Sequence, residues 1–136
     1  MLACGESAVP PSPGEGIFFP RRPPPTGLQV ALTAAATGRL AVEDGCVWLV
    51  NGPARYLVVW PHSYVLADAF GTLVVLGPER TVVARGGQVV TLGGGEVAID
   101  AEGARAAVAE LAGVQIPAVC EAELAWTANG VIPGPP

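Results

Sequence analysis

The chain has 136 residues, of which 51% are hydrophobic and 14% are charged. This is the length of one domain, with enough apolar residues for a core. The formal net charge is −5, and all 7 cations are arginines. These values exclude the clustered basic surface that nucleic-acid binding requires. The absence of lysine also excludes Schiff-base chemistry and a phosphate-loop lysine.

The first residues, Met1 to Ser7, resemble the end of a bacterial lipoprotein signal, in which a small residue precedes a cysteine that becomes lipid-modified. The resemblance implies a lipid anchor on Cys4 and an apolar signal segment upstream of it. The alternative is that Cys4 is incidental. A lipid on Cys4 is the only membrane attachment that we expect.

Residues 1–26 are predicted to be a flexible, proline-rich tail. The runs Pro10–Pro13 and Pro23–Pro25 favour an extended polyproline II spacer, because proline cannot continue a helix or a central strand. Arg21–Pro25 also has the composition of a ligand for an SH3-like domain, which is the alternative. Ile17–Phe19 interrupts the tail and is expected to dock it onto the folded part.

Residues 27–132 are predicted to form a β domain, because apolar and polar residues alternate between turn signals. The predicted strands start with an alternating run at 28–32 and a short run around 40–42. Glu43–Gly45 marks a turn, and Asn51–Gly52 marks a hairpin between the next two strands. The strands that follow this turn are expected at 46–50, 55–60, 72–76, 81–84, 88–92 and 97–99.

One segment has a different period. Ala101–Ala112 is rich in Ala and Glu with apolar residues at helical spacing, and Gly113 is a plausible stop, so one short helix is expected there. Residues 116–131 return to extended structure, and 133–136 are expected to fray. The predicted fold class is therefore mainly β: a small antiparallel barrel or sandwich, of which an OB-like barrel is one possibility, with one short helix.

Two cysteines remain when Cys4 is set aside. A disulfide between Cys46 and Cys120 would close a loop of 74 residues and contribute on the order of 4 kcal/mol. It is the simplest pairing for an exported chain. The alternative is two buried free thiols, which behave as small apolar side chains.

No residues form a recognisable catalytic or metal-binding motif. The cysteines and His62 lack the spacing of a zinc site. Ser63, His62 and Asp68 suggest a hydrolase, but neighbours on an extended chain face opposite sides and no GxSxG motif is present. We therefore predict no catalytic residues, no metal and no cofactor.

Aromatic residues are the remaining candidates for a site. The predicted ligand or partner surface consists of Trp48, Arg55, Tyr56, Trp60, His62 and Tyr64. The competing interpretation is that the aromatics, Trp126 among them, belong to the core or to cross-strand pairs. Arg55 is the charge expected to contact an anion or a partner.

Several short runs resemble a type of small uncharacterised domain found in exported proteins of GC-rich bacteria. They are Glu43–Leu49, Tyr56–Pro61, Gly93–Val97 and Ile116–Cys120. The likeness covers most of 38–120 and departs around Trp126. It implies a secreted β domain with paired cysteines and no particular substrate.

Three functions follow as hypotheses. The first is a non-catalytic, extracytoplasmic envelope protein, secreted or lipid-anchored, that binds a protein partner or associates with itself; an edge strand at 81–84 would allow strand addition. The second is a small-molecule or glycan binder that uses the aromatic residues. The third is a hydrolase that uses His62.

Overall fold

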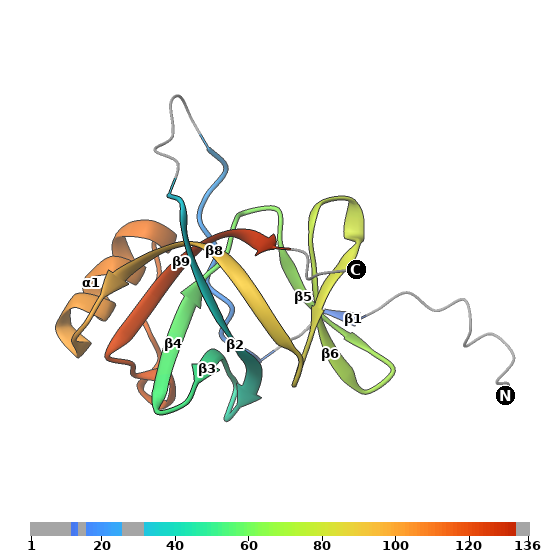
Figure 1. The fold of residues 1–136 in the computed structure, drawn as a ribbon, viewed down its shortest axis with the longest axis horizontal. Helices are drawn as coiled ribbons and strands as arrows, with labels where there is room; N and C mark the ends of the chain where they lie inside the picture. Colours follow the sequence, from blue (N-terminus) through green and yellow to red (C-terminus); the bar gives the residue numbers. More distant parts are fainter. Residues whose placement is uncertain (1–11, 14–15, 26–31, 133–136) are drawn as a thin grey trace, which may run out of the picture.

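The protein is a five-stranded β-barrel with a second, smaller sheet and one helix (Figure 1). The computed structural model describes residues 12–13, 16–25 and 32–132. The barrel strands are β2 (Ala34–Glu43), β3 (Cys46–Asn51), β4 (Ala54–Val59), β8 (Val89–Ala98) and β9 (Leu124–Ile132). They close in the order β2-β3-β4-β9-β8. The predicted mainly β barrel with one helix is thereby confirmed.

The barrel is antiparallel at every join except one. β4 and β9 run parallel, with Tyr56 opposite Leu124 and Val59 opposite Thr127. The expectation of a wholly antiparallel barrel fails at this join. After β4 the chain leaves the barrel to build the second sheet, and β9 returns beside β4 in the same direction. A five-stranded barrel closed by such a crossover has the Greek-key organisation of OB-like barrels.

Each of the two hairpin turns of the barrel contains at least one left-handed residue, which is Gly52 (φ 57°) in the β3–β4 turn. Asp44 (φ 52°) and Gly45 (φ 79°) close the β2–β3 hairpin, because a turn with two positive φ angles matches the twist of the strands. In the β3–β4 hairpin Asn51 pairs with Ala54. The turn is therefore centred on Gly52 and Pro53, one residue beyond the predicted Asn51–Gly52.

β8 is longer than the sequence indicated. Two runs, 88–92 and 97–99, were expected on either side of Gly93–Gly95, but one strand passes through the glycines. At Gly94 (φ 146°) a Cβ atom would overlap the Thr127 carbonyl oxygen of β9. The glycines therefore permit a close approach of two strands, and they do not interrupt the strand.

The second sheet has the order β1-β5-β6-β7. Its strands are β1 (Ser12–Pro13), β5 (Val65–Ala69), β6 (Thr72–Leu76) and β7 (Val82–Arg85), and the short 3-10 helix η2 (Pro78–Arg80) precedes β7. Leu66, Val75 and Ala84 from this sheet join the barrel core. β5 is five residues long, directly follows the turn after Pro61, and was not predicted from the sequence.

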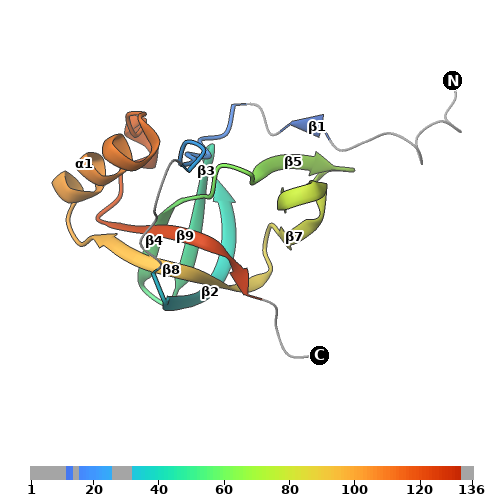
Figure 2. The same cartoon turned by 90° about the horizontal axis from the view of Figure 1, so that it is seen from above.

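The helix α1 (Ala101–Ala112) has the predicted bounds. Asp100 caps its N-terminus by accepting a hydrogen bond from the Gly103 amide, and Gly113 ends it with a left-handed φ of 69°. A 3-10 turn, η3 (Ala118–Cys120), follows in the connection to β9. Figures 1 and 2 show α1 at the end of the molecule opposite β5 and β6.

Two apolar clusters hold the barrel. The first fills its interior with residues such as Leu40, Leu49, Val58, Trp60, Leu92 and Trp126. The second lies between strands and the cover formed by α1 and η3; its members include Cys46, Trp48, Leu57, Val59, Val108 and Cys120. The outer face of β3 and β4 is therefore covered by the chain's own helix and loop.

Residues 17–22 belong to the domain and differ from the flexible tail predicted for 1–26. Phe18 forms a parallel bridge with Cys46, and Arg21 forms one with Trp60. Phe19 stacks on Trp60 with ring centres 5.0 Å apart, so the predicted docking of 17–19 is confirmed. Residues 28–31 of the first predicted strand, Cys4 and residues 133–136 lie outside the described residues.

Candidate binding surfaces

The disulfide between Cys46 and Cys120 is present, with a Cα–Cα distance of 5.6 Å. It confirms the predicted pairing. Cys46 begins β3 and Cys120 ends η3, so the bond joins the loop that follows α1 to the barrel. Both cysteines are fully buried. A buried disulfide in this position fixes the cover over β3 and β4 and has the character of a structural bond.

The predicted aromatic surface does not form, because its large rings are buried. Trp48 is 1% exposed, Trp60 0% and Tyr64 8%. Trp60 and Tyr64 lie in the barrel interior, while Trp48 lies in the cluster beneath α1 and η3. These rings therefore face two different cores, and they cannot act together as a stacking platform for a sugar or another ligand. The interpretation as core residues is the one that the structure supports.

Tyr56 is half-buried and makes an edge-to-face contact with Trp126, with ring centres 5.9 Å apart. Burial raises the pKa of its phenol above the ordinary value, and the neighbouring Glu96 carboxylate raises it further. Both effects disfavour the phenolate, since burial and a nearby negative charge penalise an anion. Tyr56 is therefore a neutral group at physiological pH and no candidate for a nucleophile.

His62 is exposed in the turn after Pro61 and borders a hollow of about 540 Å³. This hollow is lined mainly by 17–24, together with Ala112 and Val114. Among the hydrogen bonds of the described residues, none joins the His62 imidazole to a hydroxyl or a carboxylate. A nucleophile activated by His62 needs such a contact, so the geometry gives the hydrolase hypothesis no support.

The two arginines of the proline-rich segment are engaged within the domain. Arg21 Nη1 donates to the Tyr64 carbonyl oxygen at 3.1 Å, and Arg22 Nη2 donates to the Ala128 carbonyl oxygen at 2.9 Å. A ligand for an SH3-like domain has to present its arginine to the partner. The arrangement seen here uses both guanidinium groups to fasten residues 21–22 to the barrel.

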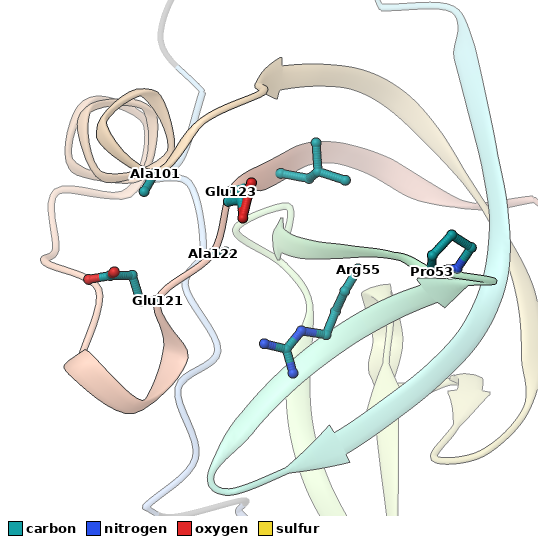
Figure 3. A pocket seen from close by; sticks show the side chains of 7 residues that line it. Pro53, Arg55, Ala101, Glu121, Ala122 and Glu123 are labelled. Carbon is teal, nitrogen blue, oxygen red and sulfur yellow. The ribbon is translucent and has the colours of Figure 1, made fainter.

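Arg55 is a second predicted site residue that borders an accessible hollow. Its guanidinium carbon is 3.8 Å from the centre of the Trp48 ring, a cation–π contact that holds the side chain over β3. The hollow has a volume of about 590 Å³ and is bordered by Pro53, Arg55, Ala101 and 121–124 (Figure 3). Sequence reasoning found Arg55 but missed Glu121 and Glu123, because only the fold brings residues 66 and more positions away beside it.

Opposite charges meet in this hollow. Glu121 is 3.6 Å from Arg105 of α1. Arg55 makes no ion pair within the described part of the chain. Its guanidinium therefore keeps donors free for a carboxylate or another acceptor. The residues that border this hollow include charged side chains but no hydroxyl, thiol or imidazole that could serve as a nucleophile or its base.

β7 ends the second sheet, and its edge is protected. The strand has only four residues, its pairing with β6 shifts register between Val75 and Leu76, and the Gln88 side chain accepts the Arg85 amide at 2.9 Å. Short length, bulges and charged residues are devices that prevent edge-to-edge pairing. Strand addition at 81–84 is therefore disfavoured as a means of self-assembly.

Among the residues that the structure describes, no group of three or more His, Cys, Asp or Glu side chains could hold a metal ion. None of the helices in these residues is long and apolar enough to cross a membrane.

Comparisons with protein-family models, with curated proteins and with solved structures found no significant match to this chain.

Proposed function

We propose that this protein is a non-catalytic binding module of an extracytoplasmic compartment, secreted or tethered to the cell envelope through a lipid on Cys4. The observation that carries the proposal is the disulfide between Cys46 and Cys120. Disulfides form and persist in oxidising compartments. The lipoprotein-like residues around Cys4 agree with such a location.

The rest of the molecule supports binding over catalysis. Among the described hydrogen bonds, the Asp68 carboxylate accepts the Gly71 amide and none joins it to His62. The barrel, by contrast, offers hollows bordered by charged and apolar side chains. Binding of a protein partner also fits better than self-assembly by strand addition, because the β7 edge is protected.

The intact mass of the natively expressed protein, with and without reduction, tests this proposal. We expect a diacylglycerol-sized increment on Cys4 and a gain of two hydrogens when the Cys46–Cys120 bond is reduced. A Cys4→Ala variant serves as the matched control, since it removes the proposed lipid site and leaves the disulfide in place. An unmodified chain with three free thiols would contradict the extracytoplasmic location.

A second candidate function is recognition of a small acidic ligand, such as an acidic sugar, at the Arg55 hollow. The observation that favours it is the guanidinium held on Trp48 at 3.8 Å, because a planar, preorganised arginine binds carboxylates through two hydrogen bonds. The neighbouring Glu121 and Glu123 carboxylates repel an anion, so a ligand with a single carboxylate fits better than one with two.

Titration with glucuronate, followed by amide chemical shifts, tests this candidate. Shifts should gather at 53–57 and 121–124 and disappear in Arg55→Gln. Arg39→Gln is the matched control, because Arg39 is an exposed arginine that does not border this hollow. Equal binding by both variants, or no binding by the unmodified protein, would remove the candidate.

A further inference from the structure

The tip of the β5–β6 hairpin has an unusual combination of features. Phe70 and Gly71 form its two-residue turn, with φ angles of 56° and 86°. Such a turn favours Asn or Asp at the first position, and a bulky residue in the left-handed region costs roughly 1–2 kcal/mol. Phe70 is nevertheless there, held by an Asp68 carboxylate that accepts the Gly71 amide at 2.7 Å.

No apolar packing of the Phe70 ring in the described part of the chain compensates for this cost. Phe70 is 78% exposed, more than the other exposed large apolar residues, and it belongs to none of the apolar clusters. A strained backbone and an exposed aromatic ring at one position suggest a role outside the isolated domain.

The strand β1 indicates what this residue faces. Ser12 pairs with Asp68 and Pro13 with Ala67, and the two strands are antiparallel. When β1 is followed toward the N-terminus, it therefore runs alongside β5 toward Phe70, which comes directly after the end of β5. In Figure 2 β1 lies beside β5, at the end of the molecule away from α1. The chain thus enters the domain from the side on which the hairpin tip lies.

The distance to the proposed anchor is short. Ser12 is eight positions after Cys4 (12 − 4), and a fully extended chain spans at most about 3.6 Å per residue, or roughly 29 Å. A lipid on Cys4 would therefore keep the hairpin tip near the membrane surface. Aromatic side chains partition readily into the interface between headgroups and acyl chains.

We infer that Phe70 is a membrane contact: its ring enters the lipid interface and orients the domain while Cys4 supplies the attachment. This inference rests on the proposed lipid anchor. The surface beside the tip favours a zwitterionic bilayer, because the neighbouring hollow contains both Arg39 and Glu43, and the net charge of −5 opposes binding to anionic lipid.

The pairing of the cysteines allows a test that does not depend on native lipidation. Cys46 and Cys120 are bonded to each other, so Cys4 is the free thiol of the 3 cysteines. Protein without the native lipid can be coupled through Cys4 to a maleimide lipid in phosphatidylcholine vesicles. The same protein capped with N-ethylmaleimide and mixed with these vesicles shows what happens without a tether.

The contact itself is read from Phe70→Trp. Trp48, Trp60 and Trp126 are 1%, 0% and 5% exposed, so the introduced indole is the exposed one. Ile99→Trp is the matched control, because Ile99 is 72% exposed and lies between the end of β8 and the start of α1. Figure 2 shows α1 at the end of the molecule away from β5. On tethered vesicles we expect a blue shift, a loss of acrylamide quenching and a gain of quenching by brominated lipid for Phe70→Trp, and no change for Ile99→Trp.

Equal behaviour of the two tethered variants, or no response of Phe70→Trp, would overturn the inference. Should Phe70→Trp fail to fold, amide exchange on the tethered parent protein provides the same test: protection of 69–72 is expected there and should be lost in Phe70→Asn. A native protein without lipid on Cys4 would instead refute the proposed location. The vesicle result would still show whether the hairpin tip contacts lipid.

Discussion

In the barrel, strands far apart in the sequence lie side by side, whereas β5, β6 and β7 follow one another along the chain. Ala34 pairs with Gly94, and Tyr56 pairs with Leu124. Within the second sheet, by contrast, Ala69 pairs with Thr72 and Val74 with Arg85. The barrel is thus held by long-range strand pairing and a disulfide. This hairpin meander is paired through short connections, although Leu66, Val75 and Ala84 pack into the barrel core.

The difference indicates where the chain can vary without unfolding. The barrel brings backbones into such close contact that a single added methyl group has no room, whereas the hairpin tip of the second sheet tolerates an exposed, strained aromatic residue. Function is commonly located on loops that a rigid scaffold positions. The four predictions below test this contrast, beginning with the largest expected effect.

Gly94→Ala should lower the free energy of unfolding by more than about 4 kcal/mol or prevent folding. The new Cβ would overlap the Thr127 carbonyl oxygen and force β8 and β9 apart. Gly71→Ala is the matched change in the second sheet, where no atom lies within 4 Å of the added Cβ; only left-handed strain of about 1 kcal/mol is expected. Urea unfolding followed by tryptophan fluorescence measures both. Similar losses of unfolding free energy in the two variants would contradict the proposed difference between the barrel and the second sheet.

Removal of the disulfide by Cys46→Ala with Cys120→Ala should cost about 4 kcal/mol, as expected for a crosslink that closes a loop of this size. The bond joins positions 74 residues apart and fixes the cover over β3 and β4. Amide exchange should therefore rise in α1 and 113–123 and stay unchanged in β5 and β6. Cys4→Ala controls for loss of a thiol. Uniform loosening of the whole protein would show that the two regions are not separate.

Phe70→Asn should raise the free energy of unfolding by about 1 kcal/mol, because Asn adopts the left-handed conformation of this turn more readily. Thermal unfolding monitored by circular dichroism measures the gain. Val82→Asn, at a 40% exposed position of β7, controls for replacement of an exposed apolar residue by Asn. Destabilisation by Phe70→Asn would mean that the ring packs within the domain after all.

The smallest expected effect on the free energy of unfolding comes from Tyr56, and it depends on pH. Its phenol has a raised pKa in the folded state because of burial and then Glu96. The associated stability is fully present below the unfolded pKa of about 10 and is lost as pH rises through the folded value. Tyr56→Phe should therefore lessen the alkaline fall in stability between pH 9 and 12, roughly the range of tyrosine titration. Urea unfolding at each pH measures this change in stability, and Tyr64→Phe serves for comparison. A pH dependence that is unaltered in Tyr56→Phe would contradict the raised pKa of Tyr56.

Local patterns gave much of the secondary structure. Asp44–Gly45 and Gly113 are turn and stop signals whose conformations depend on neighbours in sequence, and the helix 101–112 has its own period and its own cap at Asp100. β5 and the continuous β8 could not be found this way. Whether Gly93–Gly95 breaks a strand or permits a close contact depends on β9, which lies some thirty residues further along the chain.

The candidate sites show the same division. The sequence offered Trp48, Trp60 and Tyr64 as a surface, but burial is decided by what covers a strand, and α1, η3 and 17–22 cover them. Arg55 is exposed, and its guanidinium group packs on the Trp48 ring at 3.8 Å. Phe70 was missed, since whether an aromatic side chain is exposed or buried is known only once the tertiary structure gives its exposed fraction.

By itself, the sequence determined the β class, the helix with its ends and the pairing partners available to two cysteines, because these depend on local periodicity and on counting. Only the tertiary structure decided the parallel join of β4 to β9, which rings are buried, and which end of the domain the N-terminal chain approaches. Those properties arise from contacts between segments distant in sequence, and no local pattern encodes the distance between them.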